Sequence, residues 1–345
     1  MILPIAEPFI NGYPKHAIQL SILCQYNESL PWILSNYIQL KCSKDFLDLS
    51  KKSTDWFDFH FVDPKYVDSL MYIEKLSRDT VDKLKIGILD LLITSINSGL
   101  YIYTSVDEYY LPSTNAYKKR SKPHSILIYG YDSNNKILNI GGFSKGATQV
   151  NKFRTYTVTY DEFLKAYNSL NYIDNYDHYL NRIYLMKYNT SRIFDFDIVL
   201  VKELLGDYLH SKNSSERLRA FNNPSKNYNF GISVYENLIS FYKRLENNNN
   251  YFDIRPLHIL WEHKKCMVER VTYMANHKYI SNSSLLISDL IEIEKFCLNC
   301  RNLLLKYRVT KNSEIVSRLL AMLDFILVKE QKILYALYKE LDLHY

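Results

Sequence analysis

The chain has 345 residues, a length that suggests about two domains. Hydrophobic residues make up 47% and charged residues 23%, which excludes global disorder. The 43 Lys and Arg against 37 Asp and Glu give a net charge of +6 without a long basic stripe, so the signature of a nucleic-acid-binding protein is absent. This mildly basic balance suits an acidic protein or an acyl-phosphate partner.

Targeting and cofactor signals are also missing. No uninterrupted apolar stretch reaches the roughly 18 residues of a membrane helix, and the start of the chain lacks the apolar run of a signal peptide. Gly-rich nucleotide-binding motifs do not occur. We therefore expect a soluble, cytoplasmic protein with reduced thiols, no membrane partner and no cofactor.

Helices and strands alternate in residues 1–190. The first helix follows Pro14, and its spacing of Ala17, Leu20, Leu23 and Cys24 fits one buried face. The other helices of this half are expected near 30–40, over 77–97 with Ser77 or Asp79 as cap and Gly99 as stop, and over 160–169 with Asp161 near its start. The expected strands are 56–62, 100–106, 125–131, 137–143, 155–159 and 182–187, the third and fourth forming a hairpin.

Residues 191–345 are almost wholly helical in period. The expected helices are 194–210, 233–246, 255–275, 284–308 and 312–342. The pattern predicts an α+β domain over 1–190 followed by a helical domain over 191–345 that packs on it.

The cysteines and paired histidines do not form a metal site. Cys297 and Cys300 make the sole CxxC, without the second pair that zinc needs, and they lie in a helical pattern as core residues. His258 and Glu262 are helix neighbours four residues apart, whereas His258 and His263 point to different faces. We predict no metal and interpret this run as a charged helix surface or an interdomain hydrogen bond.

His124 is the histidine whose setting suggests chemistry. It follows a basic loop and opens the apolar strand 125–131. A histidine at the entry of a central strand can take the proton of a nucleophile whose pKa a helix N-terminus lowers. The alternative is a strand-end histidine satisfied by backbone or water.

Several segments together resemble a known family. They are VDEYYLP (106–112), the run from His124 to Asp132, the first helix (8–23) and the helical segment 254–274. In these the chain resembles the butirosin biosynthesis protein H N-terminal family of papain-like proteins, found beside nonribosomal peptide and related assembly lines. The resemblance implies a papain-like domain over 1–190. It also implies transfer of an acyl group from a carrier-protein thioester to an amine through an acyl-cysteine. The implied partner is an acyl or peptidyl carrier protein or a synthetase; a homodimer is left open.

The chain departs from that family pattern at two places. No cysteine occurs between Asn11 and Leu23, so Ala17, or Pro14 in another alignment, stands where the nucleophile is expected. The return strand reads Ile-Gly-Gly-Phe over 140–143 where relatives carry an acid, unless Asn139 or Asp132 replaces it.

The resemblance then yields a set of candidate site residues. They are His124 and Asp132 as catalytic residues, Cys24 as a displaced nucleophile, and His16, Ala17, Asp107 and Tyr110 as pocket residues. His124 is expected within side-chain reach of His16 and Ala17. Ser21 is expected to face its own helix backbone, and Cys24 to be buried on the apolar stripe.

Three functions remain open at this stage. The chain could bind a carrier or partner enzyme without catalysis. It could instead transfer an acyl group with His124 as general base and no covalent intermediate, since thioesters are already activated. A third function is a structural interaction made by the helical half.

Overall fold

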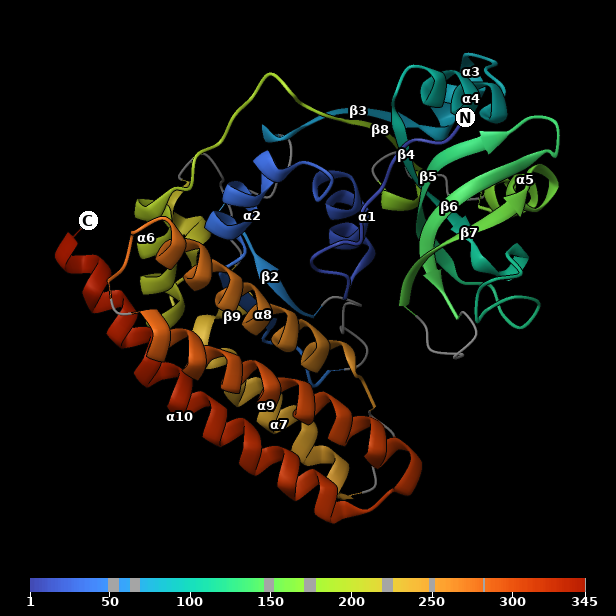
Figure 1. The fold of residues 1–345 in the computed structure, drawn as a ribbon. Coiled ribbons are helices and arrows are strands. Elements are labelled where there is room, and N and C mark those ends of the chain that lie inside the picture. The colour runs from blue at the N-terminus through green and yellow to red at the C-terminus, as the bar shows by residue number, and fades with distance from the viewer. Residues whose placement is uncertain are drawn as a thin grey trace. The chain divides into compact units, whose positions relative to one another are not determined.

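The computed structural model describes residues 1–48, 56–62, 69–145, 152–170, 178–218, 226–247, 252–281 and 283–344 (Figure 1). The chain forms two compact units, each assembled from two separate stretches. Unit 1 comprises Met1–Ser29 and Val67–Ile193, and unit 2 comprises Leu30–Tyr66 and Phe194–Tyr345. The fold class is α+β, since both sheets are antiparallel and a mainly helical region follows them in the chain.

Unit 1 is built on a six-stranded antiparallel sheet with the strand order β3-β8-β4-β5-β6-β7. Its strands are β3 (Met71–Ser77), β4 (Tyr101–Asp107), β5 (Pro123–Asp132), β6 (Ile137–Ser144), β7 (Lys152–Thr159) and β8 (Arg182–Tyr188). The predicted hairpin is confirmed as β5 and β6, with Asp132 opposite Ile137 beside the turn. Strand β3 has no counterpart among the predicted strands.

The helices of unit 1 pack on this sheet. They are α1 (Pro14–Leu23), α3 (Arg78–Lys83), α4 (Ile88–Asn97) and α5 (Tyr160–Asn168). Helix α1 packs on β5, β6 and β8, and α5 packs on β4 and β7; the two lie on opposite sides of the sheet (Figure 1). Thr159 caps α5 and completes a capping box with Glu162, so the cap lies two residues before Asp161.

The single helix predicted over 77–97 is wrong. Ser77 does cap α3, its side chain accepting a hydrogen bond from the N–H of Thr80. The helix then ends, because Lys85 has a φ of 55° and Gly87 is extended as the N-cap of α4. Gly99, with a φ of 76°, follows the end of α4 as expected.

Unit 2 combines a helical bundle with a small antiparallel sheet of order β2-β1-β9. Its helices are α2 (Leu30–Asn36), α6 (Ile198–Leu209), α7 (Val234–Lys243), α8 (Arg255–Asn276), α9 (Ser283–Thr310) and α10 (Ser313–His344), and its strands are β1 (Gln39–Ser43), β2 (Phe57–His60) and β9 (Tyr228–Phe230). Each helix expected after residue 191 is present.

The boundaries of the units differ from the expected division in one respect. One junction falls at Ile193, near the expected 190/191 boundary, but Leu30–Tyr66 groups with the helical half. The reason is long-range pairing: β1 pairs with β9, and α2 packs on α6 and α8. Of the loops expected at 221–229 and 247–250, residues 221–225 and 248–250 lie outside the described part.

A buried ion pair lies at the centre of unit 2. Nζ of Lys264 on α8 is 2.6 Å from Oε1 of Glu330 on α10, and both side chains are 1% exposed. Tyr208 on α6 and Tyr235 on α7 donate hydrogen bonds to the same carboxylate. His263 is also fully buried. The prediction of a charged helix surface around His258, Glu262 and His263 is therefore wrong at His263.

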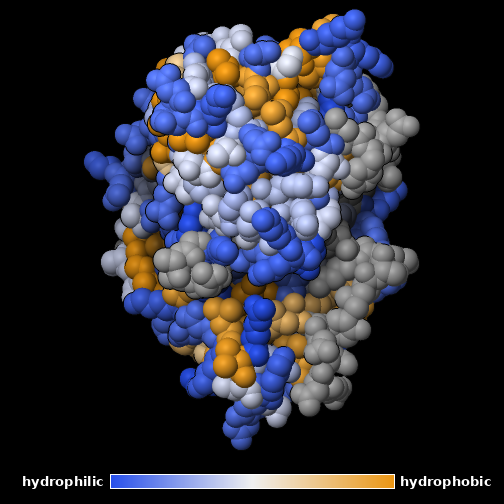
Figure 2. All heavy atoms as spheres, turned by 90° about the vertical axis from the view of Figure 1, so that its right-hand side faces the viewer, coloured by the Kyte–Doolittle hydropathy of each residue, from blue (hydrophilic) through white to orange (hydrophobic). Residues whose placement is uncertain are grey.

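The surface of unit 1 is uneven in polarity. Figure 2 shows hydrophilic and pale side chains in the region of β7 and α5, and hydrophobic ones toward the top, where α3 and α4 lie. Leu84 and Ile86, between those helices, are exposed. Within the described residues, no helix is both long and apolar enough to cross a membrane.

We predict that acid destabilises the protein through buried neutral histidines. Burial, with a smaller contribution from Lys41, lowers the pKa of His60 to about 4 from 6.5, and burial also lowers the pKa of His263. Between pH 6.5 and 4 the unfolded chain binds a proton at residue 60 that the folded chain does not. Stability is therefore full above pH 6.5 and falls by up to ~1.4 kcal/mol per pH unit from His60 alone as pH falls toward 4.

Urea unfolding at pH 7, 6 and 5 measures this slope. The variant His60→Gln should unfold with a shallower pH dependence, because it removes one such proton. The control His344→Gln changes an exposed residue and should leave the slope unchanged. Equal slopes in the parent and His60→Gln would contradict the prediction.

Candidate active site

His124 lies near the start of β5. It is directly opposite Val106 of β4, and the preceding pair is Pro123 with Asp107. The antiparallel register thus brings the start of VDEYYLP (106–112) beside the start of the histidine-bearing strand. The side chain of His124 is 22% exposed, so it is neither buried in the core nor free in solvent.

The carboxylate beside His124 belongs to Glu108, which the sequence did not identify as a site residue. Nδ1 of His124 is 2.7 Å from Oε1 of Glu108, whose side chain is 3% exposed, and Nζ of Lys122 is 2.8 Å from Oε2. Burial would raise the pKa of Glu108. The adjacent side chains of His124 and Lys122 outweigh burial and hold this pKa below its usual value. Glu108 is therefore a buried carboxylate in close contact with the imidazole of His124, although Nδ1 of His124 makes no hydrogen bond of regular geometry.

Asp107 holds this arrangement in place. It accepts hydrogen bonds from the backbone N–H groups of Tyr109 and Lys122 and from the hydroxyl of Ser121. These bonds close the loop between β4 and β5 and fix the short 3-10 turn 108–110. Asp107, predicted to line a pocket, thus stabilises the loop between β4 and β5, and these three hydrogen bonds all come from that loop. Tyr110 is half-buried in the turn, with its ring edge-on to that of Tyr109.

The return strand β6 is closely packed at the position without an acid. A Cβ at Gly142 would lie 3.0 Å from the hydroxyl of Tyr156 and 3.4 Å from Cγ2 of Ile126. A side chain at residue 142 would therefore require these neighbours to shift. The next residue, Phe143, packs edge-on against the ring of His124 with centroids 5.6 Å apart.

Asp132 and Asn139 do not replace that acid. Asp132 ends β5, eight residues beyond His124, which is roughly 25 Å along an extended strand. It is a half-buried residue beside the turn and accepts hydrogen bonds from Asn134 and Asn135. Asn139 is opposite Gly130 in the same distal half of the hairpin. The prediction of Asp132 as a catalytic partner of His124 is therefore wrong.

The first helix carries the expected pocket residues in its first turn. Pro14 is its first residue, and His16 and Ala17 are 1% and 0% exposed. Helix α1 packs on β5, the strand of His124. Side-chain reach between His124 and His16 or Ala17 stays a prediction. Ser21 donates to the carbonyl of Ile18, as expected.

The thiols are poorly placed for nucleophilic catalysis. Cys24 is the C-cap of α1, where the helix dipole is negative and disfavours a thiolate. It is half-buried, so the prediction that it would be buried is wrong. Burial raises the pKa of the thiols of Cys266, Cys297 and Cys300, and Cys42 is buried as well.

Comparison with protein-family models and with curated proteins finds no match. Across the part of the chain that the structure describes, no group of three or more His, Cys, Asp or Glu side chains could hold a metal ion. The candidate site therefore rests on its own geometry. It consists of an imidazole, a buried carboxylate and a lysine where β4 ends and β5 begins.

We predict that Cys24→Ala leaves any acyl transfer by this chain within about twofold of the parent, because a C-terminal thiol lacks the stabilisation that a nucleophile needs. Single-turnover assays with an acyl-loaded carrier measure the rate. Loss of acyl transfer in Cys24→Ala, or an acyl group recovered on Cys24, would show instead that Cys24 is the nucleophile.

Proposed function

We propose that the chain is a papain-like homologue of secondary-metabolite biosynthesis that transfers an acyl group from a carrier-protein thioester to an amine without a covalent acyl-enzyme. The observation that carries the proposal is the 2.7 Å approach of Nδ1 of His124 to the buried carboxylate of Glu108. A histidine oriented by a carboxylate is the arrangement of a general base. The resemblance of the sequence to the butirosin biosynthesis protein H family supplies the substrate class.

The proposed reaction is direct attack of the amine on the thioester carbonyl. As the C–N bond forms, Nε2 of His124 accepts a proton from the amine. The C–S bond then breaks, and the proton returns from His124 to the departing carrier thiolate. Glu108 stabilises the imidazolium between these steps and is a positioning residue. General base catalysis of this kind contributes about 10²–10⁴ in rate.

A basic loop before His124 supports the choice of partner. Lys118, Lys119 and Arg120 are exposed and precede Lys122 and His124. A carrier protein presents its acyl group on a phosphopantetheine arm, whose phosphate is an anion. Exposed basic residues beside the site would attract that phosphate or acidic side chains of the carrier. The proposed setting is cytoplasmic, in agreement with five free cysteines.

We predict that reversing charge in this loop weakens carrier binding in a salt-dependent way. Lys119→Glu combined with Arg120→Glu should raise the Kd for a carrier about tenfold at low salt and less at high salt. Calorimetric titration at two ionic strengths measures it. Lys187→Glu, an exposed change on β8, is the control. A Kd that the loop changes leave unaltered would count against docking at this loop.

The alternative is a non-catalytic protein that binds a carrier or its synthetase. Its specific support is Ala17, which is buried and stands where relatives carry the nucleophile. The two functions differ in one assay, in which the protein is mixed with an acyl-loaded carrier and a panel of amines. Release of free carrier thiol with an amide product supports transfer. Carrier binding without thiol release supports the alternative.

A further inference from the structure

Helix α10 carries exposed side chains of apolar character on successive turns. The helix runs beside α9 along an outer edge of unit 2 (Figure 1). Phe325, Val328 and Tyr335 are 49%, 67% and 37% exposed. Ala321 and Lys332 are exposed between and beside them, and we name these five residues the α10 stripe. Exposed apolar side chains that gather on adjacent turns mark interaction surfaces, whereas scattered ones are ordinary.

The spacing of the α10 stripe is that of a helix-pairing seam. Its members follow one another at steps of four, three, four and three residues, which is the 3.5-residue repeat of a coiled coil. The stripe spans roughly 21 Å of helix. A separate apolar face of α10 is buried in the bundle and includes Leu319, Leu323, Ile326, Ile333, Leu334 and Leu337. The stripe is therefore a second apolar face, which suits a second helix as its partner.

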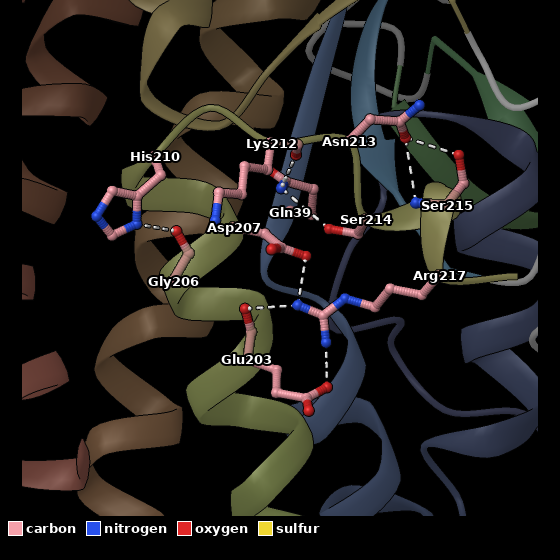
Figure 3. A network of polar contacts seen from close by, with 10 residues as sticks. All are labelled: Gln39, Glu203, Gly206, Asp207, His210, Lys212, Asn213, Ser214, Ser215 and Arg217. Carbon is pink, nitrogen blue, oxygen red and sulfur yellow. Dashed lines mark hydrogen bonds and ion pairs between the residues drawn. The ribbon is translucent and has the colours of Figure 1, made fainter.

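Neighbouring side chains hold the two aromatic residues of the stripe. Phe325 packs edge-on against Phe296 of α9, with ring centroids 5.2 Å apart. Tyr335 packs edge-on against His210, with centroids 5.8 Å apart. Nδ1 of His210 in turn donates a 2.7 Å hydrogen bond to the carbonyl of Gly206 on α6 (Figure 3). Because these rings are already packed, docking on them costs less conformational entropy than docking on free side chains.

The charges beside the stripe are arranged symmetrically about Val328. Asp324 and Lys332 lie four residues before and four residues after it, and both are exposed. None of the ion pairs that α10 forms with described residues uses either of them. A second α10 that crosses antiparallel at Val328 brings Asp324 of each copy opposite Lys332 of the other, so this ion pair forms twice. A parallel partner would place like charges together, which disfavours it.

We propose that the α10 stripe is a dimer interface on which α10 of a second copy of this chain packs antiparallel, about a twofold axis at Val328. The same axis places Ala321 opposite Tyr335, since these residues lie seven positions on either side of Val328, and a small side chain then faces a large one. The surface lies wholly within unit 2. The inference does not depend on the proposed function.

The test is sedimentation velocity of the full-length protein over a range of concentrations. The parent should show a monomer–dimer equilibrium. Asp324→Lys and Lys332→Asp should each raise the Kd of the dimer at least about tenfold, because each places like charges opposite one another. The double variant Asp324→Lys with Lys332→Asp should dimerise like the parent. Lys243→Asp, which changes an exposed lysine of α7, is the matched control and should leave the Kd unchanged.

An equimolar mixture of the two single variants makes the test independent of how each variant folds. One copy then carries lysine at both positions and the other carries aspartate at both, so the mixed dimer regains both ion pairs and should form while each variant alone stays monomeric. Three results would overturn the inference. They are a parent that stays monomeric at every concentration, a dimer whose Kd the single changes leave unaltered, and a double variant or mixture that does not recover dimerisation.

Discussion

Replacing His124 by alanine is expected to lower the rate of acyl transfer about 10²–10⁴-fold, the contribution of a positioned general base. Glu108→Gln should retain part of this rate, because glutamine preserves the shape of the side chain but not the charge that stabilises the imidazolium. Single-turnover rates on an acyl-loaded carrier measure both changes, and calorimetric carrier binding shows whether the fold and the docking surface persist.

The pair also predicts non-additivity. If Glu108 acts through His124, the double variant should be no slower than His124→Ala alone. Asp132→Asn is the matched control, because Asp132 is a carboxylate on the same strand as His124 but ends it. Equal losses from Asp132→Asn and Glu108→Gln would contradict the assignment of Glu108 as the positioning residue.

A second large effect is expected in the core of unit 2. Lys264→Met should lower the free energy of unfolding by about 3–5 kcal/mol, because it leaves the carboxylate of Glu330 buried without its ammonium partner. Denaturant unfolding measures the change. The double variant Lys264→Met with Glu330→Leu should recover much of this loss, since no uncompensated charge is then buried.

A more exposed ion pair, also made by α10 but with α9 as its partner helix, provides the control. Lys329 on α10 lies near Glu292 on α9, with side chains 22% and 49% exposed. Lys329→Met should change stability by less than about 1 kcal/mol, because solvent screens such pairs. A similar loss for Lys329→Met and Lys264→Met would show that burial of the Lys264 pair is not what makes it important.

Local patterns predicted much of the secondary structure. The apolar run after His124, the turn after Asp132 and the long helical periods after residue 191 each depend on neighbours in sequence, and all appear in the structure. The break at Lys85 was missed because a left-handed residue other than Gly has no strong sequence signal. Residues 30–66 belong to unit 2 because β1 pairs with β9. These strands lie some 190 residues apart in sequence, and no local pattern encodes such a pairing.

The candidate site was predicted in part. His124 stands out in the sequence because it opens an apolar strand, whereas Glu108 does not, because the resembled family pattern places the acid on the return strand. The register of β4 and β5 points to Glu108. Val106 lies opposite His124, and Glu108, two residues further on, is a diagonal neighbour of His124 on the same face. The tight packing at Gly142 depends on the Tyr156 side chain of the neighbouring strand, which sequence alone does not reveal.

The proposed transfer without a covalent acyl-enzyme is tested most directly by intact-protein mass spectrometry during turnover. The protein is mixed with an acyl-loaded carrier and an acceptor amine, and the masses of protein and carrier are followed with the amide product. We expect amide and free carrier thiol to form while the mass of the protein stays unchanged, and His124→Ala to slow both. An acylated form of the protein that accumulates and decays into product would contradict the account.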